Sequence, residues 1–234
     1  MSDIYDQLIR ELSKPSPRDR QRRVGPSELG DLCERCLAEK LLGIHEDENN
    51  HPLAPMIGTA FHLYLENVIG LKGYLKETKV TVGSIKGYGE IAGTCDGFDV
   101  ATGHVVDYKM LSKKKIKAFS SATFFNEQQE PEFYSDSRTE LQLKKYYYQM
   151  MLYGLGMENS GHEVNYCSLV LFPRDCTIES VLQASHELCF KYDRAAALAV
   201  LERATQIFQW ADENRDNIGE LDSHPGCYYC AFKR

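Results

Sequence analysis

The sequence of 234 residues predicts an α/β protein in which helices flank a mixed central sheet. Two changes in the spacing of apolar residues indicate this class. Helical spacing gives way to the alternation typical of strands near residue 78, and helical spacing returns near residue 138. The composition, 43% hydrophobic and 26% charged, is ordinary for globular proteins. This length favours one large domain over two.

The expected elements follow in order along the chain. Apolar stripes at helical spacing predict helices over residues 1–14, 27–43, 57–69, 138–154 and 185–214. Alternating or continuous apolar residues predict strands over residues 78–82, 88–100, 105–110 and 164–172. Ser27 is expected to be the N-cap of the second helix. Polar composition predicts a linker over residues 14–26 and loops over residues 44–55 and 113–137.

Charge and hydropathy exclude some classes of protein. The chain has no run of about 18 apolar residues, so we expect no membrane-spanning helix and no membrane partner. The charged N-terminal segment lacks the apolar stretch of a signal peptide, which predicts a cytoplasmic protein. Because the net charge is −7, nucleic acid could bind only at a local basic patch. The candidates are Lys113, Lys114, Lys115 and Lys117, for which the alternative is a solvated loop.

Two aspartates on neighbouring strands are the most informative feature of the middle third. If the turn is centred on Ala101 and Thr102, Asp96 lies directly opposite Asp107. Like charges that face each other across a ladder destabilise it, so a cation is expected between them. Lys109 points to the same face as Asp107 and supplies part of that charge, and a divalent metal ion would supply the rest. The alternatives are a solvent-facing hairpin, or a three-residue loop that shifts the register.

The same segment resembles the signature of PD-(D/E)XK nucleases, because Gly93-x-x-Asp96 is followed by Asp107-x-Lys109. Two further motifs are similar to those of the RecB-like branch, which includes CRISPR-associated and phage recombination exonucleases. They are Gly58-Thr-Ala-Phe-His62 before the strands and Gln149-Met-Met-Leu-Tyr153 after them. The resemblance implies a restriction-endonuclease-like core as the fold.

The resemblance also implies a role for each matching residue. A divalent metal ion, Mg²⁺ or Mn²⁺, would be bound by His62, Asp96, Asp107 and the main-chain carbonyl of Tyr108. Oxygen ligands with one imidazole suit these ions. Lys109 would orient or activate the attacking water. Gln149 and Tyr153 would position the lysine or the DNA strand.

Some positions leave alternatives open. Gln142-Leu-Lys-Lys-Tyr146 also fits the Gln-x-x-x-Tyr pattern, but the apolar neighbours of Gln149 suit packing on the sheet better. Asp107 stands where many relatives have Glu, which shortens the ligand arm. Glu66 could reach the metal, although a surface glutamate is the simpler interpretation. Glu77 is expected just before the first strand, and one interpretation of this position has it face the site.

Two C-x-x-C pairs, Cys33-Glu-Arg-Cys36 and Cys227-Tyr-Tyr-Cys230, predict a four-thiolate metal site that joins distant segments of the chain. Spacing alone allows tetrahedral zinc or an iron–sulfur cluster. The related exonucleases carry a 4Fe-4S cluster, so the resemblance favours this cluster, with Zn²⁺ as the alternative. Those relatives usually have one early and three late cysteines, whereas this chain has two of each.

Together these features predict a metal-dependent DNA exonuclease that acts on single-stranded ends in recombination or repair. The alternatives are an endonuclease with the same active site and a non-catalytic nucleic-acid-binding protein held together by its metal cluster. A recombination or helicase protein is the expected partner. The single domain, residues 1–234, would comprise an N-terminal helix and linker (1–26), a cysteine region (27–43 with 218–234) and a nuclease core (56–217).

Overall fold

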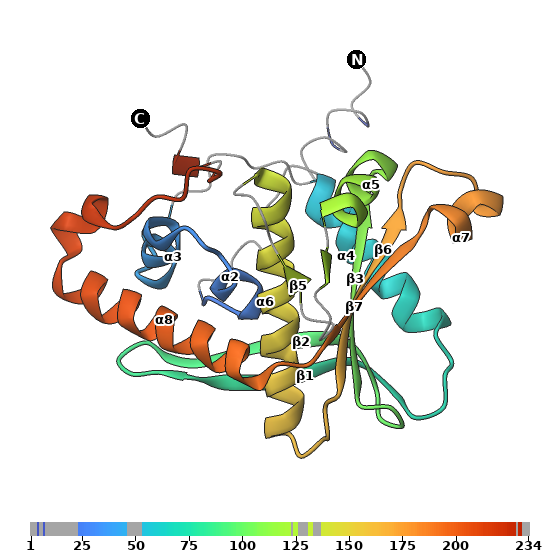
Figure 1. Cartoon of the computed structure of the whole chain (residues 1–234), viewed down its shortest axis with the longest axis horizontal. Helices are drawn as coiled ribbons and strands as arrows, with labels where there is room; N and C mark the ends of the chain where they lie inside the picture. Colours follow the sequence, from blue (N-terminus) through green and yellow to red (C-terminus); the bar gives the residue numbers. More distant parts are fainter. Residues whose placement is uncertain are drawn as a thin grey trace.

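The computed structural model describes residues 4, 7, 23–45, 53–122, 124–125, 131–132, 137–227 and 229–230. Its α-helices are α2 (Pro26–Leu29), α3 (Glu34–Leu41), α4 (Leu53–Val68), α5 (Lys113–Ala122), α6 (Arg138–Asn159), α7 (Val181–Ala184) and α8 (Arg194–Glu213). Its strands are β1 (Tyr74–Ile85), β2 (Gly89–Asp99), β3 (His104–Leu111), β4 (Phe124–Phe125), β5 (Pro131–Glu132), β6 (Tyr166–Pro173) and β7 (His186–Lys191). Two 3-10 helices, η1 (Ile178–Ser180) and η2 (Arg215–Glu220), complete the described elements (Figure 1).

Five of the strands form one sheet in the order β1-β2-β3-β6-β7. Neighbouring strands are antiparallel except β3 and β6, which are parallel. The long segment between these two strands contains α5 and α6, as a parallel connection requires. The sheet is therefore mixed and accompanied by helices, which confirms the predicted fold class (Figure 1).

Helix α6 is the centre of the hydrophobic core, and every residue from 149 to 157 is buried. Gly156 allows α6 to approach β1 closely, since a Cβ atom there would lie only 2.7 Å from Val80 Cγ2. Helix α8 packs against α6 and β1, and α2 packs against α6 (Figure 1). Helix α4 packs against β3, and the Phe61 ring lies 5.2 Å from the Phe172 ring of β6.

The predicted helix over residues 27–43 is two short helices. The N-cap of α2 is Gly25, not Ser27, and the Gly25 N–H donates a hydrogen bond to the Glu28 carboxylate at 2.9 Å. The chain turns at Gly30, where it passes so close to α6 that a Cβ atom would lie 2.5 Å from a main-chain carbonyl oxygen of that helix. This close approach ends the first helix, and α3 begins after Cys33.

The predicted helix over residues 185–214 is wrong in its first part. Strand β7 precedes α8, and the buried side chains of Leu188 and Phe190 alternate with exposed neighbours. This period of two is the strand signal, and it ends before Asp193, which caps α8 by accepting a hydrogen bond from the Ala196 N–H at 3.0 Å.

The predicted loop over residues 113–137 begins with a helix, α5. Ile116 and Phe119 lie one turn apart and are buried, so the lysine-rich segment has an apolar helical stripe.

The expected helix over residues 1–14 lies outside the described residues except at positions 4 and 7, which are helical. None of the described helices combines the length and the apolar character needed to cross a membrane.

Candidate active site and cysteine cluster

The hairpin of β2 and β3 has the predicted register. Its ladder includes the pair Gly97 and Val106, so Asp96 lies opposite Asp107 at the next position. Beyond the last main-chain pair, a side chain joins the two strands: Asp96 Oδ2 accepts a hydrogen bond from the Tyr108 N–H at 2.8 Å. The two carboxylates are therefore neighbours at the end of this ladder.

Asp107 is only 1% exposed, and both of its carboxylate oxygens contact the charged or polar end of another side chain. Oδ2 lies 2.6 Å from Lys109 Nζ, and Oδ1 accepts a hydrogen bond from Gln149 Nε2 at 2.9 Å. Burial raises the pKa of Asp107 to about 6, against the lowering effect of the Lys109 charge. Burial also lowers the pKa of Lys109, but the charges of Asp107 and Asp96 outweigh it and leave that pKa above its usual value. Lys109 is thus a charged donor held beside two carboxylates.

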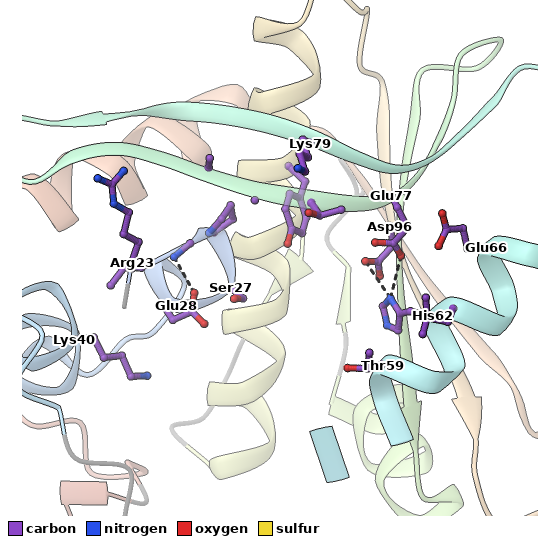
Figure 2. Close-up of a pocket in the computed structure, with 18 of the residues that line it drawn as sticks. Arg23, Ser27, Glu28, Lys40, Thr59, His62, Glu66, Glu77, Lys79 and Asp96 are labelled. Atoms are coloured by element: carbon purple, nitrogen blue, oxygen red, sulfur yellow. Dashed lines mark hydrogen bonds and ion pairs between the residues drawn. The ribbon is translucent and has the colours of Figure 1, made fainter. Parts of the chain in front are cut away.

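His62 extends from α4 toward the carboxylates of Asp96 and Glu77, as Figure 2 shows. Its Nδ1 lies 3.3 Å from Asp96 Oδ1 and 3.5 Å from Glu77 Oε1. Hydrogen bonds to Asp96 and Glu77 raise the pKa of His62 to about 9. One ligand atom from each of these three residues lies within 4.8 Å of the other two. Two carboxylates and one imidazole at this spacing suit a small divalent cation.

Glu77 is the site residue whose position the sequence did not predict. It lies within β1, which begins at Tyr74, rather than before the first strand. Its φ of 44° makes it the one non-glycine with positive φ among the described residues. The β1–β2 ladder also omits the pairing of Glu77 with Asp96, although Lys76 pairs with Gly97 on one side. Such backbone strain is concentrated at functional sites, and here it accompanies a carboxylate that points at His62.

Both candidate Gln-x-x-x-Tyr pairs on α6 contact the site. Gln149 binds Asp107, and it also hydrogen-bonds the buried Tyr153 side chain. In the competing pair, Gln142 Nε2 donates to the Tyr146 hydroxyl at 2.8 Å. Lys109 Nζ lies 5.4 Å from the centre of the Tyr146 ring, within the range of a cation–π contact. The helix therefore holds Asp107 through one pair and Lys109 through the other.

A cavity of about 1180 Å³ opens beside the group of His62, Glu77 and Asp96 and extends toward α2 and α3. His62, Glu77 and Asp96 line one end, and Arg23 and Lys40 lie across the space (Figure 2). The cavity thus has two carboxylates and an imidazole at one end and basic side chains, together with Glu28, farther along.

The four lysines predicted to contact nucleic acid lie on α5 and do not line this cavity. Lys113, Lys114 and Lys117 are exposed, as a phosphate-binding role requires. Lys115 is partly buried, and its Nζ lies 5.7 Å from the centre of the Phe119 ring. Burial and the nearby Arg174 charge lower the pKa of Lys115.

The four predicted cysteine ligands converge. Cys33, Cys36, Cys227 and Cys230 are all at most 7% exposed, and their sulfur atoms lie within 4.8 Å of one another. Cys33 is the N-cap of α3, and hydrogen bonding from Cys36 is the main reason that its pKa falls to about 5. The arrangement places four thiols where they could hold one metal centre. The spacing of the other four cysteines within strand and helix patterns predicts small core residues. This is correct for Cys95 and Cys167, which are buried in the main core, and wrong for Cys176, which is partly buried, and Cys189, which is exposed.

Comparison with known proteins supports the fold alone. No family model matches this chain, and no curated protein matches it by sequence. A protein of Eubacterium rectale that is provisionally named an exonuclease superposes with a TM-score of 0.53 at 13% identity, covering 94% of both chains. The alkaline exonuclease of Laribacter hongkongensis superposes with a TM-score of 0.51 at 12% identity, covering 90% of this chain and 96% of its own. The chain therefore has the fold of these two proteins, which fits the predicted PD-(D/E)XK core.

Proposed function

We propose that this protein is a metal-dependent deoxyribonuclease that hydrolyses phosphodiester bonds at single-stranded DNA ends, in recombination or repair. The observation that carries the proposal is the convergence of Asp96, Asp107 and His62 beside the ammonium group of Lys109. Residues from α4, β2 and β3 come together here, and their types match the motif order of PD-(D/E)XK nucleases.

The donor set fits Mg²⁺ or Mn²⁺, which would be held by His62, Asp96, Asp107 and the main-chain carbonyl of Tyr108. Glu77 adds a third carboxylate on the side of His62. The Tyr108 peptide is fixed by the hydrogen bond from its N–H to Asp96. A bound ion of this kind polarises a phosphoryl oxygen and lowers the pKa of a coordinated water.

The other side chains orient this set. Gln149 holds one oxygen of Asp107, so the second oxygen faces Lys109. Lys109 keeps its charge and can donate hydrogen bonds to the attacking water or to the phosphate as negative charge develops. Tyr146 and Tyr153, both on α6, limit the movement of Lys109 and Gln149 respectively. We therefore assign positioning roles to Gln149 and Tyr153.

A nucleic acid as the substrate is supported by the names of the two proteins that share the fold, both of which are called exonucleases, and by the basic side chains along the cavity. The exposed lysines of α5 would add contacts to phosphates outside it. A recombination or helicase protein remains the partner that we propose. The cytoplasm is the compartment that we propose, because reduced thiols persist there as metal ligands.

The proposal is tested by incubating the purified protein with end-labelled linear single strands and with closed single-stranded circles, in Mn²⁺ buffer. We expect the linear strand to be degraded and the circle to survive. Asp107→Ala should abolish degradation, whereas Asp212→Ala, an exposed aspartate on α8, should not.

The remaining outcomes separate the alternatives. Cleavage of the circle by the wild type but not by Asp107→Ala would indicate an endonuclease. Binding of the linear strand without Asp107-dependent cleavage would contradict the nuclease proposal and favour a non-catalytic DNA-binding protein.

A further inference from the structure

The cysteine cluster is a small buried unit, separate from the main hydrophobic core. Cys33 Sγ lies 3.4 Å from Cys230 Sγ, and Cys36 Sγ lies 3.5 Å from both Cys227 Sγ and Cys230 Sγ. These distances exclude disulfides, whose sulfur atoms are bonded at about 2.05 Å. Four separate thiols therefore surround a common centre.

The spacing of the sulfur atoms discriminates between metal centres. Zinc–sulfur bonds of about 2.3 Å in a tetrahedron place neighbouring sulfurs about 3.8 Å apart. The observed contacts of 3.4 to 3.5 Å, and the upper limit of 4.8 Å for the whole set, suit four ligands on one ion. In a 4Fe-4S cluster each thiolate binds a different iron at a different corner, so the four cysteine sulfurs must lie outside a cube of iron and sulfide. A set of sulfurs this close leaves no room for that cube.

We infer that the four cysteines bind a single zinc ion in place of the iron–sulfur cluster that the resemblance favours. This inference is independent of the proposed nuclease activity. All four positions around the ion are occupied by protein sulfurs, which is the arrangement of a structural zinc site and leaves no open position for substrate.

The surroundings show what this ion would hold in place. Arg35, on α3, donates hydrogen bonds through Nη2 to the carbonyls of Gly219 and Leu221, and its N–H donates to the Asp222 carbonyl at 3.3 Å. Beyond these contacts, the described part of the segment after residue 222 buries the two late cysteines. Zinc would therefore replace a hydrophobic core for this segment.

The cysteine cluster also lies next to the wall of the cavity that His62, Glu77 and Asp96 line. The ring of Tyr229, which packs against the cysteines, lies 5.1 Å from the ring of His45 in an edge-to-face contact. His45 lines the cavity together with Lys40, which is on α3. Zinc binding would thus hold in place the C-terminal end of α3, which faces the cavity proposed to bind DNA.

The inference is tested by metal analysis of the full chain purified without oxygen from cells supplied with both iron and zinc. We expect one zinc per chain, no acid-labile sulfide and no visible absorption. After removal of zinc, Co²⁺ should bind at one equivalent and give the visible bands of a tetrahedral thiolate site. Iron with an equal amount of acid-labile sulfide would overturn the inference, and so would a chain that binds neither zinc nor Co²⁺.

Variants locate the ion and distinguish this site from the nuclease site. Cys36→Ser should lower the zinc content at least tenfold, while Cys176→Ser, at a partly buried cysteine outside the cluster, should leave it unchanged. Asp107→Ala should also retain one zinc, even though it removes the proposed catalytic ligand. Loss of zinc from Asp107→Ala but not from Cys36→Ser would place the zinc at the site on the strands and contradict the inference. Because the cobalt measurement uses the wild type, it holds even if Cys36→Ser fails to fold.

Discussion

The two candidate metal sites differ in the ligand atoms that they offer. The site on the strands offers carboxylate oxygens and one imidazole, lines a cavity and lies beside a partly buried lysine. The cysteine site offers only sulfur, lies apart from the main core and is closed on all sides by its own ligands. Hard ligands beside a cavity suit an ion that works on a substrate, whereas four soft ligands suit an ion that holds the chain.

The two sites also differ in what supports them. Asp96 and Asp107 lie on adjacent strands of a five-stranded sheet, which would persist without a metal ion. Among the described residues after residue 222, only Cys227 and Cys230 are buried. We therefore expect loss of ligands on the strands to affect chemistry more than stability, and loss of the cysteines to affect stability first.

The largest effect is expected for Lys109→Ala. Removing the ammonium group beside Asp107 takes away the donor that stabilises charge developing on the phosphate, so the rate of DNA cleavage should fall by about 1000-fold. Single-turnover cleavage in Mn²⁺ measures the change. Lys86→Ala, in the exposed β1–β2 turn, is the matched control. A Lys109→Ala rate within tenfold of the wild type would contradict the role of Lys109.

Cys230→Ser tests whether the cysteine site stabilises the chain. Loss of the ion would destabilise the chain by about 3 kcal/mol or more. For a domain of this size such a change lowers the thermal midpoint by on the order of 10 °C. Calorimetry or circular dichroism measures this shift against Cys176→Ser, which lies outside the cluster. An equal shift in both variants would mean that the cluster has no special structural role.

Glu77→Gln tests whether the strained residue belongs to the oxygen site. The substitution keeps the size of the side chain but removes a negative charge that lies 3.5 Å from His62. We expect the affinity for Mn²⁺ to fall about tenfold, the loss typical of a weakened metal environment. Titration of Mn²⁺ by electron paramagnetic resonance reports the affinity directly. Glu90→Gln, at an exposed position of β2, should leave it unchanged.

The lysines of α5 are expected to have a smaller effect, on binding alone. Changing Lys113, Lys114, Lys115 and Lys117 together to Ala should weaken binding of single-stranded DNA and reduce its salt dependence. The slope of log affinity against log salt should decrease by about 0.7 for each lysine that contacts a phosphate. Fluorescence anisotropy over a series of salt concentrations measures both quantities. An unchanged slope would remove α5 from the DNA-binding surface.

The smallest effect concerns the pH dependence of stability without Mg²⁺ or Mn²⁺. The pKa of His62 is raised from 6.5 to about 9 by Asp96 and Glu77, so the folded state holds the proton more tightly than the unfolded state. The stabilisation is complete below about pH 6.5 and is lost as the pH rises to about 9. Urea unfolding of the wild type and of His62→Gln should therefore differ more at low pH than at high pH. A difference that grows with pH would contradict this assignment.

The sequence predicts most of the sheet and much of the oxygen site, because both depend on local spacing. A turn at residues 101 and 102 and strict alternation are enough to place Asp96 opposite Asp107. Strand β7 is missed because its six residues adjoin a long helical pattern. The position of Glu77 depends on the register of β1 against β2 and on a positive φ, neither of which has a sequence signal.

The contacts of α6 and the spacing of the cysteine sulfur atoms also needed the structure. The spacing of Gln142, Tyr146, Gln149 and Tyr153 shows a shared helical stripe but not that each pair binds a different site residue. Two C-x-x-C pairs predict four thiolates, whereas the distances between their sulfur atoms are a property of tertiary packing.

The wide separation of the two cysteine pairs along the chain has a consequence for how the protein is made. Cys33 and Cys36 are synthesised long before the other pair, because 191 positions separate Cys36 from Cys227, its contact across the cluster. A nascent chain can therefore have an assembled sheet before the second pair of thiols exists. Four cysteines could bind the ion only after Cys230 has been synthesised, and a product released before Cys227 could not complete the site.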